Sequence, residues 1–311
     1  MRGKTVVITG GNAGIGLEAA RALTRMGASV VITSRDPSKG ESALAELREL
    51  AQRASGGGSR PEPACVPLDL ASLASVEACA RELLDRCPRV DVLILNAGLI
   101  LDTRGLTVDG FETTFGVNHL GHFHLTALLR ERLIASAPAR IVVVSSTAHK
   151  GAPKGLDFDD LMGERRYQGF VAYARSKLAN LYFTKALARR LAGTGVTVNA
   201  LHPGTVRTRF ARDGDLRRPL ARLIFALITP FMLRPDRGAR TSVYLASAPE
   251  LDGQTGGYYA RCKLARTTKV AGDEAAAERL WTMSEALIAE ARARALPPAP
   301  EPQSSREASP T

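Results

Sequence analysis

Val6-Val-Ile-Thr-Gly10-Gly-Asn-Ala-Gly14-Ile-Gly16 is the stretch of this sequence that decides the fold. Its first three residues form a short apolar, β-branched run, which is typical of a strand buried in a parallel sheet. A glycine-rich turn follows directly, and the helical pattern beyond it ends at Gly27, a residue type that often terminates helices. A strand, a glycine turn and a helix in this order direct backbone amides and a helix N-terminus toward a phosphate group.

The spacing of the glycines separates two kinds of phosphate-binding loop. Gly10, Gly14 and Gly16 follow the pattern GxxxGxG rather than GxGxxG. Gly11 and Gly16 also match the outer glycines of a Walker A loop, but Leu17 stands where that loop requires lysine. The sequence therefore excludes a P-loop nucleotide hydrolase, and it leaves a dinucleotide-binding turn and an ordinary tight turn as the alternatives.

The end of the second predicted strand, residues 29–33, indicates which dinucleotide is bound. An acidic residue at this place bonds the adenosine ribose of NAD, whereas an arginine accommodates the 2′-phosphate of NADP. Ser34 is neutral, and Arg35 is a strong bidentate phosphate donor. Asp36 could be taken for the ribose carboxylate, but Asp36-Pro37 fits the N-cap and first position of the next helix. The sequence favours NADP over NAD.

Apolar runs and helical patterns alternate along most of the chain. Further strands are predicted near 65–70, 91–95, 140–144, 196–201 and 257–260. Helices are predicted over about 38–53, 72–87, 115–136, 171–191, 238–247 and 273–293. This alternation predicts an α/β fold, a single-domain doubly wound parallel sheet (Rossmann fold) with helices on both faces. We expect this domain over residues 1–295 and a disordered tail over residues 296–311, which are rich in Pro, Ser and Glu.

Small and polar residues follow several of the predicted strands. They are Asn96-Ala97-Gly98, Ser145-Ser146 and Pro203-Gly204. Ligands of doubly wound sheets bind outside the carboxyl ends of the strands, so these residues should lie along one edge with the glycine turn. Small residues there allow a backbone to lie close against a ligand.

Tyr173 and Lys177 are the candidate proton-transfer pair. A spacing of four places them on one helix face, about one turn apart. An ammonium beside a phenol favours the phenolate and so moves the tyrosine toward a usable general acid/base. The same pair also fits the exposed face of an amphipathic helix. The surrounding residues have to distinguish a proton-transfer pair from a surface pair.

Seven motifs occur in the order found in the short-chain dehydrogenase/reductase superfamily, which the chain resembles from Thr5 to about Arg266. They are TGGNAGIG, DL at Asp69, NAG, a helix asparagine, SS, YARSK and HPGTVRT. FGVNHLGHF, YARSKLAN and GGYYARCKLAR are most similar to the retinol-dehydrogenase-like branch of that superfamily.

The resemblance implies a role for each matching residue. Tyr173 would be the general acid/base, and Lys177 would lower its pKa and hydrogen-bond the nicotinamide ribose. Ser146 would orient the substrate, and Asn118 would hold a water in a proton relay. The implied cofactor contacts are Gly10, Asn12, Gly14, Ile15, Gly16, Arg35, Asp69, Leu70, Asn96, Ala97, Gly98, Tyr173, Lys177, Pro203, Gly204, Val206 and Thr208. Among these, Asp69 would contact the adenine, and Val206 and Thr208 the nicotinamide carboxamide.

The expected function is that of an NADP-dependent oxidoreductase. It would transfer a hydride between nicotinamide and a hydrophobic alcohol, aldehyde or ketone. The alternative is a catalytically silent NADP-binding sensor or scaffold protein. Binding-only relatives commonly lose the tyrosine or the lysine, and this chain keeps both.

The most apolar segment, Leu220 to Leu233, lies where the superfamily has a variable substrate lid, about 207–235 in this chain. Its apolar character favours a lid for a lipophilic substrate. A buried packing helix is one alternative. Another is an interfacial membrane helix, because Arg217, Arg218 and Arg222 flank the segment.

Composition argues against several other classes of function. Lys and Arg total 42 against 31 acidic residues, a formal charge of +11, but the basic residues are scattered and only 5% of residues are aromatic. We therefore expect no nucleic-acid partner. The four cysteines form no CxxC pair, and His119, His122 and His124 lack the spacing of a zinc helix, so no metal is expected.

The chain also lacks an apolar run of about eighteen residues, so no membrane-spanning helix is expected. The apolar run at Thr5 is too short for a signal peptide, which indicates a cytoplasmic protein. Membrane-anchored retinol dehydrogenases carry a hydrophobic segment at the N-terminus, whereas the first predicted strand here starts at Thr5. Retinoid turnover in a membrane therefore does not follow from the resemblance. The resemblance allows a homo-oligomer, because superfamily members often form dimers or tetramers.

Overall fold

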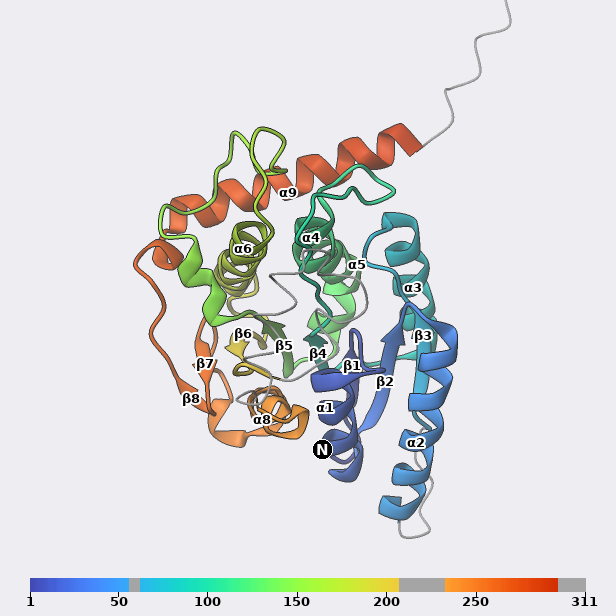
Figure 1. The fold of residues 1–311 in the computed structure, drawn as a ribbon. Coiled ribbons are helices and arrows are strands. Elements are labelled where there is room, and N and C mark those ends of the chain that lie inside the picture. Colours follow the sequence, from blue (N-terminus) through green and yellow to red (C-terminus); the bar gives the residue numbers. More distant parts are fainter. Residues whose placement is uncertain (56–61, 207–232, 296–311) are drawn as a thin grey trace, which may run out of the picture.

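The computed structural model describes residues 1–55, 62–206 and 233–295 (Figure 1). Within them the centre is an eight-stranded sheet of order β3-β2-β1-β4-β5-β6-β7-β8. Its strands are β1 (Thr5–Ile8), β2 (Ser29–Ser34), β3 (Ala64–Pro67), β4 (Val92–Leu95), β5 (Ala139–Val144), β6 (Val196–His202), β7 (Tyr258–Ala260) and β8 (Lys263–Leu264). All neighbours pair in parallel except β7 and β8, which are antiparallel.

Helices cover both faces of the sheet. They are α1 (Gly14–Arg25), α2 (Pro37–Ser55), α3 (Leu73–Arg86), α4 (Thr113–Phe115), α5 (Gly121–Ala135), α6 (Gly169–Arg190), α8 (Pro235–Ser247) and α9 (Glu274–Ala295). Figure 1 shows α1, α2 and α8 on one face and α3, α5 and α6 on the other, with α9 lying across the outside of α6. A π-helical turn over Gly116–Leu120 joins α4 to α5, and a 3-10 turn over Thr147–Gly151 follows β5.

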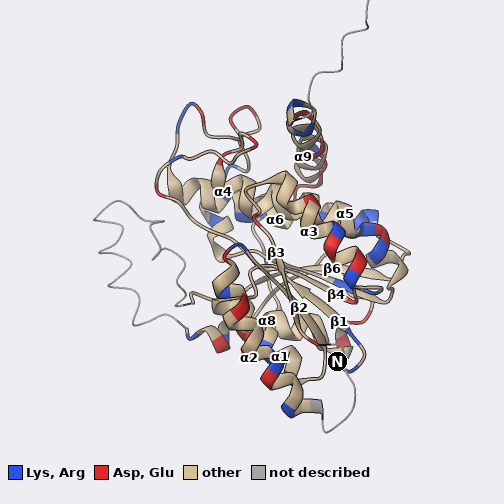
Figure 2. Ribbon diagram, turned by 90° about the vertical axis from the view of Figure 1, so that its right-hand side faces the viewer, with Lys and Arg blue, Asp and Glu red and all other residues tan. Residues whose placement is uncertain are grey.

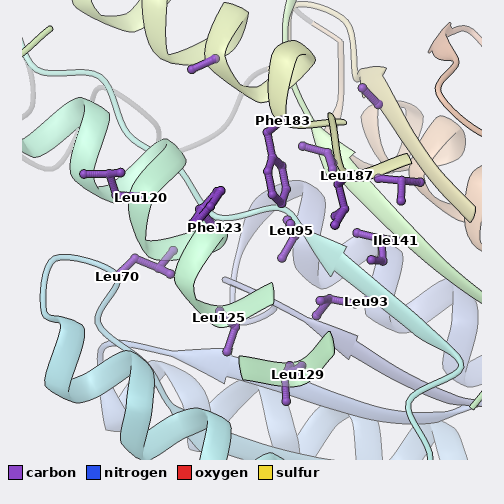
Figure 3. Packing of buried hydrophobic residues seen from close by; sticks show 14 of the residues in the cluster. Leu70, Leu93, Leu95, Leu120, Phe123, Leu125, Leu129, Ile141, Phe183 and Leu187 are labelled. Carbon is purple, nitrogen blue, oxygen red and sulfur yellow. The ribbon is translucent and has the colours of Figure 1, made fainter. Parts of the chain in front are cut away.

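Successive residues of each strand contribute to two different hydrophobic cores. Val6 and Ile8 of β1 pack beneath α1, α2 and α8, whereas Val7 packs beneath α3, α5 and α6. Leu93 of β4 and Ile141 of β5 belong to the second core, and Figure 3 shows them facing side chains from α5 and α6. A sheet buried on both faces requires continuous apolar strands, which is the pattern of this sequence.

The outer helix α9 is held by an aromatic cluster. The Trp281 ring lies 4.7 Å from the Phe123 ring and 6.0 Å from the Phe183 ring, centroid to centroid. The Arg190 guanidinium lies 4.0 Å from the Trp281 ring centroid and pairs with Glu278 at 2.6 Å. These contacts hold α9 against the outer side of α6.

The strand order reverses at one point of the sheet. The chain runs outward from β1 to β2 and β3 and then returns to β4, which pairs with β1 on its other side. After β1 and β4 the chain therefore continues to helices on opposite faces of the sheet, α1 and α5, and ligands of such sheets bind at this switch point.

The doubly wound parallel sheet with helices on both faces is confirmed, and two details differ from the sequence prediction. An antiparallel eighth strand follows β7, and the helix predicted over 115–136 begins with a π turn. Figure 2 shows basic and acidic residues interspersed over the helices, and ion pairs such as Arg21–Glu46 join α1 to α2. No helix in the described parts of the chain is long and apolar enough to cross a membrane.

Candidate active site

The glycine turn after β1 is shaped for a phosphate group. Gly10 and Gly14 have φ of 64° and 54°, in the left-handed region that glycine tolerates. A Cβ on Gly16 would lie 2.4 Å from the Gly10 carbonyl oxygen and 2.5 Å from Asn96 Nδ2. Helix α1 begins at Gly14, and its N-cap residue Ala13 has no side-chain acceptor for the first amides. These amides are available to a ligand phosphate, so the turn fits a dinucleotide.

Hydrogen bonds fasten the glycine turn to the end of β4. Thr9 Oγ1 accepts from the backbone amides of Asn96 at 2.8 Å and Ala97 at 3.1 Å. The Asn96 side chain donates in return to the Thr9 carbonyl at 3.0 Å. Asn96 and Ala97, predicted as cofactor contacts, therefore hold the two loops of the switch point together.

The two charged residues after β2 have different surroundings. Asp36 accepts from the Lys39 amide at 3.2 Å and pairs with the Lys39 ammonium at 3.3 Å, at the start of α2. The hydrogen bond from the Lys39 amide is the main cause of the lowered pKa of the Asp36 carboxyl. Arg35 is exposed and makes no hydrogen bond or ion pair with any residue the structure describes. Its guanidinium is therefore free to bind a phosphate.

Asp69 and Leu70 lie after β3 and differ in orientation. Asp69 accepts from the Ala71 amide at 3.0 Å and stays partly exposed. The Leu70 side chain belongs to the buried core, and its carbonyl oxygen would lie 2.7 Å from a Cβ on Gly121. Of the two, only Asp69 offers a side chain to a ligand at the sheet edge.

Asn118 lies on the π turn and is fully buried. Its side chain accepts from the Leu99 amide at 2.8 Å and donates to the Leu99 carbonyl at 2.9 Å and to Ser176 Oγ at 3.0 Å. A Cβ on Gly98 would lie 3.0 Å from Asn118 Oδ1 and 3.4 Å from Lys177 Nζ. The turn after β4, Asn118 and Lys177 are thus close together, and π turns often occur at functional sites.

The two serines after β5 have different partners. Ser145 is buried and donates to the Lys177 carbonyl at 2.7 Å. Ser146 is partly exposed, accepts from the Ala148 amide at 3.1 Å and hydrogen-bonds the Tyr173 hydroxyl. Ser146 is therefore the serine that a substrate beside Tyr173 can reach.

Tyr173 and Lys177 lie on one face of α6, as their spacing predicts. Lys177 Nζ lies 5.6 Å from the Tyr173 ring centroid and donates to the Val144 carbonyl at 3.2 Å. Burial lowers the pKa of Lys177 to about 8. Burial raises the pKa of Tyr173 to about 12, against a smaller lowering by its hydrogen bond with Ser146. Lys177 is not among the causes of this shift, so the lowering of the tyrosine pKa by Lys177 stays a prediction.

The loop after β6 completes the edge. Gly204 has a φ of 94°, and a Cβ there would lie 2.5 Å from Leu233 Cδ1. Val206 pairs with Leu233 and packs with Ile15 around Gly238. Residues 207–232 lie outside the described residues. They include Thr208, most of the predicted lid and, except for Leu233, the membrane contact predicted for 220–233.

Sequence reasoning missed a buried histidine that links the loop after β1 to the π turn. His122 Nε2 lies 2.9 Å from Thr9 Oγ1, and its Nδ1 lies 3.3 Å from the Asn118 carbonyl. Burial lowers the pKa of His122 to about 3, so the imidazole is neutral. The spacing of four between Asn118 and His122 was the available signal. No cluster of His, Cys, Asp and Glu in the described residues is arranged to hold a metal ion.

The chain and its fold have counterparts among known proteins. A family model described as short chain dehydrogenase matches residues 4–158 and 159–217. Retinol dehydrogenase 14 of Homo sapiens is 47% identical over 295 residues, covering 93% of this chain and 87% of that protein. The crystal structure of an uncharacterized protein from Mycobacterium paratuberculosis has a TM-score of 0.71 at 37% identity, covering 92% of this chain and 93% of that chain.

Two further solved structures carry different cofactors. The 3-ketoacyl-(acyl-carrier-protein) reductase of Brucella melitensis, complexed with NADH, has a TM-score of 0.61 at 25% identity and covers 83% of this chain and 96% of that one. Pseudomonas aeruginosa RhlG, complexed with NADP, has a TM-score of 0.60 at 26% identity and covers 83% and 94%. Similar folds thus hold either cofactor, and the choice in this chain depends on its own residues.

Proposed function

Because this chain belongs to the short-chain dehydrogenase family, whose members are oxidoreductases of CH–OH groups, we propose that it uses NADP to interconvert a hydrophobic alcohol and its aldehyde or ketone. The observation that carries the proposal is the meeting of Ser146, Tyr173 and Lys177 at the sheet edge that also bears the glycine turn. Proton transfer and cofactor binding would thus take place side by side.

Arg35 supports NADP as the cofactor. Its guanidinium is exposed and unpaired within the described residues, whereas the neighbouring Asp36 carboxylate is engaged by Lys39. A free arginine binds a 2′-phosphate, while a carboxylate engaged elsewhere is less available to a ribose. The glycine turn and the α1 N-terminus would hold the pyrophosphate.

Tyr173 would move the proton on the substrate oxygen. In reduction its hydroxyl donates a proton to the carbonyl oxygen, and in oxidation the phenolate takes the proton of the alcohol. Ser146 would hold the same oxygen by a second hydrogen bond, and Lys177 would bind the nicotinamide ribose. The cofactor, when bound, supplies or accepts the hydride at the carbon.

Apolar side chains near Tyr173 support a hydrophobic substrate. Phe170, one turn before Tyr173 on α6, is 60% exposed, and Leu99 and Ile100 after β4 are partly exposed. A Cβ on Gly151 would lie 3.0 Å from the Phe170 ring. Relatives named retinol dehydrogenases make all-trans-retinal the first substrate to test.

The test is a substrate panel with purified protein and NADPH. Retinal, long-chain aldehydes, steroids and quinones are added in turn, and the loss of NADPH absorbance is followed. We expect turnover with at least one lipophilic carbonyl compound. Tight NADPH binding without turnover of any compound would overturn the proposal in favour of a cofactor-sensing protein.

A further inference from the structure

The peptide group between Ser146 and Thr147 is bound on both sides by histidine side chains. His149 Nδ1 lies 2.6 Å from the Ser146 carbonyl oxygen. The Thr147 amide nitrogen lies 3.3 Å from His202 Nδ1. His149 belongs to the 3-10 turn after β5, and His202 is the last residue of β6. The peptide is therefore tied both to its own turn and to the neighbouring strand.

The two bonds require opposite tautomers of the two imidazoles. A carbonyl oxygen can only accept, so His149 Nδ1 carries a proton and donates. A backbone amide can only donate, so His202 Nδ1 is unprotonated and accepts. A peptide whose carbonyl and amide are both bound cannot rotate without breaking one of these bonds.

We propose that His149 and His202 are positioning residues that fix the peptide plane after Ser146 and thereby aim the Ser146 hydroxyl at Tyr173 and the substrate oxygen. The inference rests on the proposed function, in which Ser146 orients the substrate. Ser146 Oγ already accepts from the Ala148 amide and bonds Tyr173, so its direction depends on the backbone that follows it. The histidines themselves act only through that backbone.

The burial of His149 is hard to explain by packing alone. Its side chain is fully buried, and its Nε2 atom has no hydrogen-bond partner among the described residues. The ring packs edge-on against Tyr258, with centroids 5.4 Å apart. A phenylalanine could make the same ring contact without burying an unpaired nitrogen, which is costly. Unlike phenylalanine, the imidazole provides the hydrogen bond from Nδ1 to the Ser146 carbonyl oxygen.

The surroundings of His202 keep its Nδ1 atom unprotonated and able to accept the hydrogen bond from the Thr147 amide. Burial is the main cause that lowers its pKa to about 4, and His149, Arg261 and Lys150 lower it further. At neutral pH the His202 ring is therefore uncharged. Its position next to Pro203 also connects the serine turn to the loop expected to contact the nicotinamide.

Paired substitutions at each histidine test the proposal. Leucine removes the Nδ1 hydrogen bond, whereas asparagine offers an amide nitrogen or oxygen close to the same position. His149→Leu and His202→Leu should lower kcat by about 10–100-fold, because small misplacements of an orienting group are costly. His149→Asn and His202→Asn should recover most of kcat. The Kd of NADPH, measured by fluorescence, should change less than kcat and confirms folding of each variant.

A double-mutant cycle with Ser146→Ala separates positioning from general damage. If His149 acts through Ser146, then His149→Leu should cause little further loss of kcat in the Ser146→Ala background. The same loss in both backgrounds, or full activity of both leucine variants, would overturn the inference. If Ser146→Ala itself keeps wild-type turnover, the proposed role of Ser146 fails instead, so the two failures are distinguishable.

Discussion

Lys177 Nζ lies 5.6 Å from the Tyr173 ring centroid, and burial moves the pKa values of these two groups in opposite directions. The pKa of Lys177 falls to about 8 and that of Tyr173 rises to about 12. Both shifts disfavour the charged form of the group. At neutral pH Tyr173 therefore keeps the proton that reduction of a carbonyl compound requires, and Lys177 carries a charge that it can readily lose.

Lys177→Met should make the fold more stable at neutral pH while it removes most of the turnover. The pKa of Lys177 falls from 10.5 to about 8, which corresponds to a burial cost of about 3 kcal/mol for the charged form. Methionine removes this cost but also loses the bond to the Val144 carbonyl, about 1 kcal/mol. The net gain in unfolding free energy should be about 2 kcal/mol at pH 7.

The pH dependence of this gain checks its cause. Below pH 8 the folded and the unfolded chain both bind the Lys177 proton, so wild type bears the full cost. Between pH 8 and 10.5 only the unfolded chain binds it, and wild-type stability rises with pH. Urea unfolding at pH 7 and near pH 10 should therefore show the advantage of Lys177→Met shrinking. A variant less stable than wild type at pH 7 would contradict the burial cost.

Arg35→Ala should weaken NADPH binding far more than NADH binding. Loss of a charge-assisted hydrogen bond of about 1.5–3 kcal/mol corresponds to a roughly 10–100-fold higher Kd. Arg53→Ala, at the exposed far end of α2, removes the same charge and should leave both affinities nearly unchanged. Titration calorimetry with the two cofactors measures the effect. Equal losses for NADPH and NADH would argue against a 2′-phosphate contact.

Three histidines should make the protein acid-sensitive before its carboxylates titrate. Burial lowers the pKa of His119 and His122 to about 3 and that of His202 to about 4, from 6.5. Their stabilising contribution is complete above pH 6.5 and is lost as the pH falls toward these folded-state values. Each should lower the unfolding free energy by about 1.4 kcal/mol per pH unit below 6.5. Urea unfolding of wild type and His119→Phe between pH 6.5 and 5 tests this, because the slope of the variant should be smaller by about 1.4 kcal/mol per pH unit. An unchanged slope would contradict it.

The fold was predictable because its signals are local. The apolar run from Val6 to Ile8, the glycine turn and the later strands each read correctly from a few adjacent residues. For the same reason the sequence could assign Asp36, but not Arg35, to the N-cap of α2, because a helix N-cap is defined by its immediate neighbours. The antiparallel strand β8 was missed because Lys263 and Leu264 are only two residues and carry no alternating pattern.

The sequence indicated which residues lie together at the sheet edge, but it did not indicate their pKa values. The pKa of Tyr173 depends on the desolvation of its phenol, and segments distant in the sequence determine how deeply the phenol is buried. The bond between Thr9 and His122 joins residues 113 positions apart, so no local pattern reveals it. The same holds for the bond from Thr147 to His202, which are neighbours only because β5 pairs with β6.

Tyr173→Phe should abolish turnover and leave the cofactor bound. Removal of a general acid typically costs about 10²–10⁴-fold in rate. Tyr182→Phe is a matched control on the same helix, because its hydroxyl bonds the Val270 carbonyl at 3.0 Å, away from the site. That variant should lose about 1 kcal/mol of stability and keep its turnover.

The most direct measurement follows a labelled hydride from NADPH to the substrate. NADPH deuterated at nicotinamide C4, on the face that is transferred, is incubated with retinal or the best aldehyde of the panel, and the alcohol is analysed by mass spectrometry. Wild type and Tyr182→Phe should yield alcohol with one deuterium on the carbinol carbon, and Tyr173→Phe should yield none while still binding NADPH. Labelled alcohol from Tyr173→Phe at the wild-type rate, or unlabelled alcohol from wild type, would contradict the account.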